Sequence, residues 1–210
     1  MISTGPNRHM TIRPYREDDH SAVYDICIRT GDRGADATGK FRDPDLLPDI
    51  YAGPYTCLEP SLAFVLDDGG RAVGYVLGTA DTPAFVRAVR ERWLPRLADR
   101  YPQPPDAPAT IDEEFLAILW QPERMLLPEL AGFPAHLHID VLPDHQGGGY
   151  GRRLVETFFM AAAQAGAPGV HVAVATANAA AHGFYLRIGF EAIPVAGASG
   201  VVYYGCRTGA

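Results

Sequence analysis

A glycine-rich turn between a predicted strand and a predicted helix constrains the fold of this chain more than any other segment. The turn spans Gln146–Gly151 and holds four glycines within five consecutive positions. Glycine has no Cβ atom, so the backbone amides of such a turn can approach an anion closely. The amides also converge at the N-terminus of the following helix, which carries a partial positive charge. We therefore predict that this turn binds a phosphate or pyrophosphate group.

The segments on either side of the turn have clear and different periodicities. Residues 136–142 alternate strictly between polar and apolar side chains, which predicts a strand. One face of this strand carries three polar residues, which are His136, His138 and Asp140. Residues 152–165 instead have apolar side chains at helical spacing, and glycine and proline follow them. This second pattern predicts an amphipathic helix that ends near residue 165.

The remaining patterns predict an α+β sandwich around a mixed sheet. Strands are predicted at 10–15, 61–66, 72–79, 170–175, 190–194 and 201–207, and helices at 17–29, 45–51 and 178–188. Residues 80–134 are predicted to form a mostly helical insertion, with helices at 83–101 and 111–130, the latter interrupted near Pro122. We expect a flexible tail over residues 1–10 and a single domain over residues 11–210.

Composition and charge limit the classes of partner. The formal net charge of the 210 residues is −7, which argues against a nucleic-acid interface and slightly favours a cationic substrate. The three cysteines stand far apart, so their spacing matches neither a disulfide framework nor a zinc site. No apolar run approaches the roughly 20 residues that span a bilayer, and the first ten residues lack a signal-peptide core. We expect a cytoplasmic monomer or homodimer without a membrane partner, with an exposed final strand available for pairing between subunits.

The spacing of the glycine turn distinguishes between phosphate-binding motifs. A dinucleotide-binding Gly-x-Gly-x-x-Gly turn would need a glycine where Arg152 stands. A P-loop would need a Gly-Lys-Ser/Thr sequence, which is missing here. The turn fits the pattern Gln-x-x-Gly-x-Gly through Gln146, Gly149 and Gly151.

These residues resemble the motifs of the GCN5-related N-acetyltransferases (GNAT). In that family the Gln-x-x-Gly-x-Gly turn follows a Val-x-Pro strand end, which stands here at residues 141–143. Residues 178–190 resemble the family's Asn-x-x-Ala-x-x-x-Tyr-x-x-x-Gly-Phe signature, and they follow the turn after one helix and one strand. The resemblance covers about residues 11–79 and 135–207. More narrowly, the insertion and residues 135–141 are similar to bacterial relatives of the acetyltransferase-like domain at the end of O-GlcNAcase, which implies a fold and not a substrate.

The resemblance implies a GNAT fold with a mixed, mostly antiparallel central sheet, helices on both faces and a helical insertion at about 80–134. It also implies acetyl-CoA as the acyl donor, direct attack by an amine acceptor in a ternary complex, and no metal. The acceptor stays open between a small molecule and a protein lysine. The coenzyme-binding residues that it implies are Val141, Leu142, Gln146, Gly147, Gly148, Gly149, Tyr150, Gly151, Arg152, Asn178, Ala181 and Tyr185. The backbone amide of Val141 or Leu142 would bind the thioester carbonyl, and Asn178 either caps the last helix or contacts the pantetheine.

Three residues are candidates for the chemistry of acetyl transfer. An amine has a pKa near about 10 and must lose a proton before it attacks, and an acid assists the leaving thiolate. The resemblance places Tyr185 beside the coenzyme sulfur as that acid. Asp140 and His138 are candidates on the acceptor side, as a base, a proton relay or a cation-binding carboxylate. They rank above His136 because they lie nearer the end of the strand, and a polar cluster that only shapes the sheet is the alternative.

Two other functions stay open at this point. The pattern His136-x-His138-x-Asp140 also occurs in metal-dependent hydrolases, although Val141 stands where that motif needs a further histidine. A degenerate acetyltransferase-like module could instead bind a ligand or a partner without catalysis. The intact Gln-x-x-Gly-x-Gly turn favours a working coenzyme pocket over the degenerate module.

Overall fold

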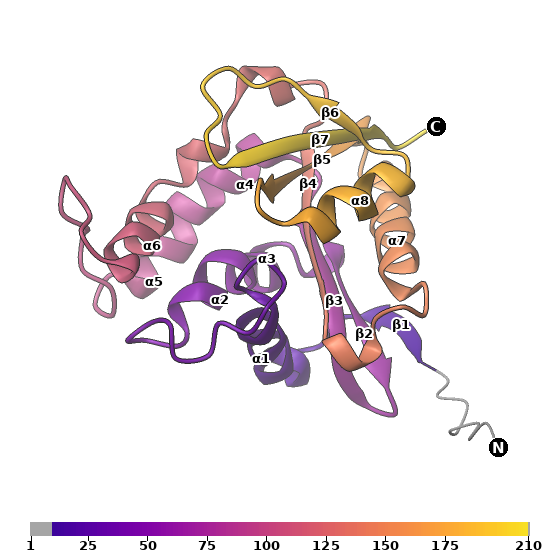
Figure 1. The fold of residues 1–210 in the computed structure, drawn as a ribbon, viewed down its shortest axis with the longest axis horizontal. Helices are drawn as coiled ribbons and strands as arrows, with labels where there is room; N and C mark the ends of the chain where they lie inside the picture. Colours follow the sequence, from indigo (N-terminus) through magenta and orange to yellow (C-terminus); the bar gives the residue numbers. More distant parts are fainter. Residues whose placement is uncertain (1–9, 210) are drawn as a thin grey trace.

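A seven-stranded sheet with the strand order β1-β2-β3-β4-β5-β7-β6 organises the molecule (Figure 1). The computed structural model of the protein describes residues 10–209, so nearly all of the tail predicted at residues 1–10 lies outside the described residues. The strands are β1 (Thr11–Pro14), β2 (Ala63–Asp68), β3 (Arg71–Thr79), β4 (Ala135–Val141), β5 (Gly169–Ala175), β6 (Glu191–Ile193) and β7 (Val201–Arg207). Neighbouring strands are antiparallel except for β4 and β5, which are parallel.

Helices cover both faces of the sheet, which confirms the predicted fold class. The helices outside the insertion are α1 (His20–Thr30), α2 (Leu46–Tyr51), α3 (Gly53–Leu58), α7 (Tyr150–Gln164) and α8 (Ala179–Arg187). Helix α1 packs on β3 and β4, and α7 packs on β2, β3 and β4 from the opposite side (Figure 1). On the face of the sheet that α7 covers, Phe158 of α7 is fully buried and packs against Gly78 of β3. A Cβ atom at Gly78 would lie 2.5 Å from the Phe158 ring, so glycine is needed for this close approach.

The insertion predicted at about 80–134 is helical, but its helices are shorter than predicted. It holds α4 (Thr82–Ala88), a π-helical turn (Val89–Trp93), α5 (Leu94–Leu97) and α6 (Ile111–Trp120). Helix α6 begins with a capping box between Thr110 and Glu113. It ends at Trp120 because Pro122 disfavours the helical conformation of the residue before it. The helix predicted over 111–130 is therefore wrong beyond residue 120, where short 3-10 turns follow.

The parallel pair β4 and β5 touches only at its beginning. The register pairs are Ala135 with Val170 and His136 with His171, and beyond them the two strands diverge. Each strand runs on for several residues, so the second half of β4 presents backbone groups on the side that faces away from β3. This split in the middle of the sheet positions the candidate site.

The last strand of the chain is not at an edge of the sheet. Strand β7 pairs with β5 on one side and with β6 on the other, so β6 forms that edge. The expectation of an exposed final strand is therefore wrong, because a short hairpin folds β6 back outside β7. Within residues 10–209, every helix is too short or too polar to cross a lipid bilayer.

Candidate active site

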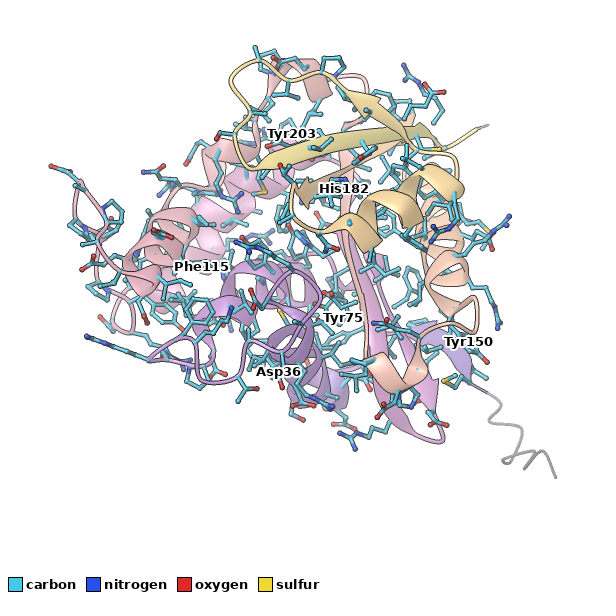
Figure 2. The ribbon with its side chains drawn as sticks, in the orientation of Figure 1. Asp36, Tyr75, Phe115, Tyr150, His182 and Tyr203 are labelled. Atoms are coloured by element: carbon cyan, nitrogen blue, oxygen red, sulfur yellow. The ribbon has the colours of Figure 1, made fainter. Side chains whose placement is uncertain are left out.

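A cavity of about 460 Å³ lies where β4 and β5 diverge. One side of it is formed by β4 residues 137–140, β5 residues 173–175 and α8. The other side is formed by the end of α1, the turn after it, Tyr51 and the insertion helix α6 through Phe115. Figure 2 shows Phe115 on the insertion side, Tyr75 in the sheet and Tyr150 on the far side of the sheet. The predicted residues that line this cavity are His138, Asp140, Asn178, Ala181 and Tyr185.

The backbone of β4 offers two open amides in the second half of the strand. The Leu142 N–H donates to the Val73 carbonyl at 2.9 Å, so Leu142 faces β3. Because hydrogen bonds alternate along an antiparallel pair, the amides of Ile139 and Val141 point the other way, where β5 has diverged from β4. The Val141 carbonyl accepts a hydrogen bond from Gln146 Nε2 at 2.7 Å. Of the two predicted donors for a thioester carbonyl, only Val141 therefore has an available N–H.

The glycine turn contains backbone conformations that favour glycine. Gly147 and Gly149 have φ angles of +81° and +77°, in the left-handed region that favours glycine. Gly149 is the N-cap of α7, and Tyr150 is the first residue of that helix. A Cβ atom at Gly151 would lie 3.4 Å from the Phe184 ring, so this glycine allows α7 to approach α8 closely.

The turn does not line the cavity itself, and neither does Arg152. The Nε atom of Arg152 donates to Glu156 Oε1 at 2.7 Å on the exposed side of α7. Arg152 borders a second hollow of about 720 Å³ between α7 and the end of β7. The structure thus places the turn at the end of β4 and the predicted catalytic side chains farther along the split. An elongated ligand would be needed to reach both.

Three residues of the second motif line the cavity: Asn178 at the N-cap of α8, and Ala181 and Tyr185 within that helix. Asn178 Oδ1 accepts a hydrogen bond from the Ala181 N–H at 3.1 Å, so Asn178 caps this helix and also lines the cavity. Tyr185 is 7% exposed, and its ring packs against Phe190 and Tyr204. Its hydroxyl has no hydrogen-bond partner among the described residues, so it is available to a ligand. Burial, with a smaller effect of the Asp140 charge, raises the pKa of Tyr185 above its usual value.

Asp140 accepts a hydrogen bond from a tyrosine that the sequence analysis does not identify as a site residue. The Tyr75 hydroxyl donates to Asp140 Oδ2 at 2.6 Å, and the two residues stand opposite each other in the β3–β4 register. Burial raises the pKa of Asp140 to about 7, although the hydrogen bonds from Tyr75 and Thr30 oppose the shift. The carboxyl group is therefore half ionised near neutral pH, which suits a general base.

The two histidines of β4 share one tyrosine hydroxyl. The Tyr55 oxygen lies 2.7 Å from His136 Nε2 and 3.1 Å from His138 Nε2. His136 Nδ1 lies 2.7 Å from Thr82 Oγ1, so both of its ring nitrogens are bound. His138 lines the cavity and His136 does not.

Both histidines are neutral at neutral pH. Burial, followed by the charges of Arg124 and His171, lowers the pKa of His138 to about 4. Burial and the neighbouring histidines also lower the pKa of His136 well below its usual value. Tyr55 lies on α3, a helix that the sequence does not predict, and nothing in the local sequence marks Tyr55 or Thr82 as partners.

The metal-site alternative is not supported by this arrangement. Both nitrogens of His136 are occupied by hydroxyl groups, and Asp140 is bound by Tyr75. Across the described part of the chain, no group of three or more His, Cys, Asp or Glu side chains is placed to hold a metal ion. The His-x-His-x-Asp pattern therefore lacks its first ligand.

Comparisons with known proteins agree with this geometry. Residues 35–190 match the Acetyltransferase (GNAT) family. Over 140 residues, or 66% of this chain, the sequence is 31% identical to Protein O-GlcNAcase of Rattus norvegicus, and the match spans only 15% of that relative. This confirms the predicted resemblance to a domain of O-GlcNAcase.

Solved structures extend the comparison to nearly the whole chain. The crystal structure of SsHAT is 54% identical, with a TM-score of 0.91, and the match covers 95% of this chain and 98% of that one. The structure of yncA, a putative acetyltransferase from Salmonella typhimurium with its cofactor acetyl-CoA, shares the fold at 16% identity. Its TM-score is 0.53, and the match covers 95% of this chain and 94% of that one.

Proposed function

Because the chain belongs to the acetyltransferase (GNAT) family, we propose that it transfers an acetyl group from acetyl-CoA to an amine acceptor. The observation that carries the proposal is the split between β4 and β5. It leaves the Val141 amide open beside a cavity that contains Asp140, His138 and Tyr185. A hydrogen-bond donor, a base and a phenol thus occur together at one place, which is what acyl transfer from a thioester requires.

The coenzyme would bind along the split in an extended conformation. Its pyrophosphate would lie on the amides of Gly147–Gly151 at the start of α7, where the helix dipole favours an anion. Its pantetheine amides would pair with the open edge of β4, as an added strand does. This places the thioester carbonyl at the Val141 N–H and the sulfur near Tyr185. Asn178 would border the pantetheine from the opposite side.

The two pKa values separate the roles of the acceptor-side groups. The pKa is about 7 for Asp140 and about 4 for His138, so Asp140 is the stronger base by roughly a thousandfold. Asp140 therefore takes a proton from the ammonium form of the acceptor, and the neutral nitrogen then attacks the thioester carbonyl carbon. The second proton leaves the nitrogen when the tetrahedral intermediate collapses, and the departing thiolate takes it up. His138 accepts a hydrogen bond from the amine, and this bond orients the lone pair of the amine nitrogen toward the carbonyl carbon.

The leaving group is stabilised rather than fully protonated by Tyr185. A thiol has a pKa near about 8.5, whereas burial raises the pKa of Tyr185 above about 10, so complete proton transfer from the phenol would be unfavourable. The carbon–sulfur bond breaks while Tyr185 donates a hydrogen bond to the sulfur. The Val141 N–H stabilises the oxyanion of the tetrahedral intermediate, which forms when the amine attacks and collapses as the carbon–sulfur bond breaks.

A panel of primary amines tests the proposal through acetyl-CoA-dependent release of free thiol. We expect at least one amine to be acetylated, with no acetyl group on the protein when the amine is left out. Replacing Asp140 by Asn should slow turnover roughly 10²- to 10⁴-fold and leave the dissociation constant of acetyl-CoA nearly unchanged.

Calorimetry with acetyl-CoA distinguishes the alternatives. Binding without turnover on any amine would favour the non-catalytic binding module. If acetyl-CoA produced no heat and no thermal stabilisation, the proposed coenzyme site would be wrong.

A further inference from the structure

A chain of hydrogen bonds runs from the cavity into the interior of the molecule. It links His138 to Tyr55, Tyr55 to His136, and His136 to Thr82. Its inner end is the Pro134 carbonyl, which lies 2.7 Å from Thr82 Oγ1. His138 lines the cavity, whereas the side chains of Tyr55, His136 and Thr82 do not.

The carbonyl at the inner end fixes the direction of the first two hydrogen bonds. Two oxygens at 2.7 Å need a hydrogen between them, and a carbonyl has none, so the Thr82 hydroxyl donates to Pro134. Its single hydrogen is then used, and Thr82 Oγ1 must accept from His136 Nδ1–H. Because His136 is neutral, its Nε2 atom carries no hydrogen and is an acceptor.

The same reasoning fixes the state of His138. Tyr55 donates its one hydrogen to His136 Nε2, so the Tyr55 oxygen must accept from His138 Nε2–H. Neutral His138 then has an unprotonated Nδ1 atom. Among residues 10–209 this atom has no hydrogen-bond partner, and the ring borders the cavity.

We propose that Thr82, His136 and Tyr55 are positioning residues that hold His138 in the Nε2–H tautomer and present the Nδ1 lone pair to the acceptor amine. This inference rests on the proposed function, in which His138 contacts the amine. The three residues act on the reaction only through His138, because none of them reaches the cavity.

The chain orients His138 but does not conduct a proton away from it. A proton passed inward would make His136 an imidazolium, which burial and the nearby groups His171, His138 and Arg124 all disfavour. It could not continue past Thr82, because a peptide carbonyl does not hold a proton. The proton of the amine therefore goes to Asp140, and the tautomer of His138 is kept through turnover.

Replacing Thr82 by Val tests the chain at its inner end, away from the cavity. The Thr82 N–H also donates to Pro134 at 2.8 Å, so the valine variant keeps the backbone contact and loses only the hydroxyl. His136 Nδ1–H then has no acceptor, and His136 changes to the Nε2–H tautomer. Tyr55 reverses its hydrogen bond, and His138 becomes an Nδ1–H tautomer that can no longer accept from the amine. Replacing Thr82 by Ser keeps the hydroxyl and is the matched control.

The measurement is NMR of isotope-labelled histidine in the full-length protein, which distinguishes protonated from unprotonated ring nitrogens. We expect His138 as Nε2–H in the native and Thr82→Ser proteins, and a large Nδ1–H population in Thr82→Val. An Nδ1–H His138 in the native protein, or an unchanged tautomer in Thr82→Val, would overturn the inference.

Kinetics of the same variants test the link to the reaction. We expect kcat to fall on the order of tenfold to hundredfold in Thr82→Val, with the KM for acetyl-CoA unchanged, and to recover in Thr82→Ser. A changed tautomer with unchanged kcat would support the hydrogen-bond chain and would instead remove His138 from the proposed reaction. Failure of the tautomer inference, seen by NMR, is therefore distinguishable from failure of the proposed role of His138, seen in kcat.

Discussion

At the scale of single residues, Asp140 is set between two opposing effects. Burial favours its neutral form and raises its pKa to about 7, whereas the hydrogen bonds from Tyr75 and Thr30 favour the ionised form. A carboxyl group left in water would be ionised throughout the physiological range. Its placement beside the cavity therefore makes this residue sensitive to pH where a general base is useful.

The pH dependence of kcat/KM should follow the ionisation of Asp140. Because the pKa is raised, the base form is lost as pH falls below about 7, so kcat/KM should drop about tenfold per pH unit there and level off above it. Tyr75→Phe removes a donor that lowers this pKa, so the rising limb should move to higher pH. Rate profiles from pH 5 to about 9 check this prediction.

Tyr24→Phe provides a matched control for the tyrosine variant. Tyr24 makes an equally short hydrogen bond, 2.6 Å, to Asp49, and neither residue lines the cavity. The Tyr24→Phe variant should keep the rise of kcat/KM near pH 7 at its native position. The Asp140→Asn variant should lose this pH-dependent rise. A limb that persists in Asp140→Asn would mean that another group is the base.

At the scale of elements, helix α7 is bounded by left-handed glycines at both ends. Gly149 with φ +77° begins it, and Gly166 with φ +88° follows its last turn. Neither has an atom within 4 Å of an added Cβ, so a side chain at either place is opposed by backbone strain and not by a clash. The two ends differ in that only the N-terminal one carries the partial positive charge that favours an anion.

This symmetry gives a controlled test of the coenzyme turn. Gly149→Val and Gly166→Val should each reduce the free energy of unfolding by about 1–2 kcal/mol or more, because both force a branched residue into a left-handed conformation. Only Gly149→Val should also weaken acetyl-CoA binding, measured by calorimetry, since its side chain would occupy the pyrophosphate position. Equal affinities in the two variants would contradict the assignment of the turn.

At the scale of the whole molecule, the sheet consists of two parts that are weakly joined. Strands β1–β4 form one part and β5–β7 the other, and two register pairs connect them. The cavity lies between these parts, with one wall completed by the helical insertion. A ligand in the split would contact both parts and would stabilise the folded state that holds them together.

Acetyl-CoA should therefore stabilise the molecule as a whole. At 100 times its dissociation constant it should add roughly 2.7 kcal/mol, which raises Tm by about 5–10 °C for a chain of this size. Hydrogen exchange should slow on both sides of the split, in β4 near Val141 and in β5 near Ala175. Protection on one side alone would show that the coenzyme does not lie between the strands, and Gly149→Val should show neither effect.

The sequence by itself determined the local features of this protein. Alternation along residues 136–142 and the helical spacing after the turn predicted β4 and α7, because these periodicities follow from the geometry of each element. The two motifs at 146–151 and 178–190 were sufficient to predict the family and its sheet.

Only the tertiary structure decided what surrounds the polar residues of β4. Tyr75 meets Asp140 across 65 positions of the sequence, and Tyr55 meets His136 across 81. A periodic pattern places a side chain on a face but does not identify its partner on another element, so neither contact was predictable. The divergence of β4 from β5 and the open amide of Val141 likewise depend on how strands distant in the sequence pair. The sequence thus placed the candidate side chains of β4 and α8 on particular faces, whereas the pKa values and hydrogen bonds that set their chemistry arise from long-range packing.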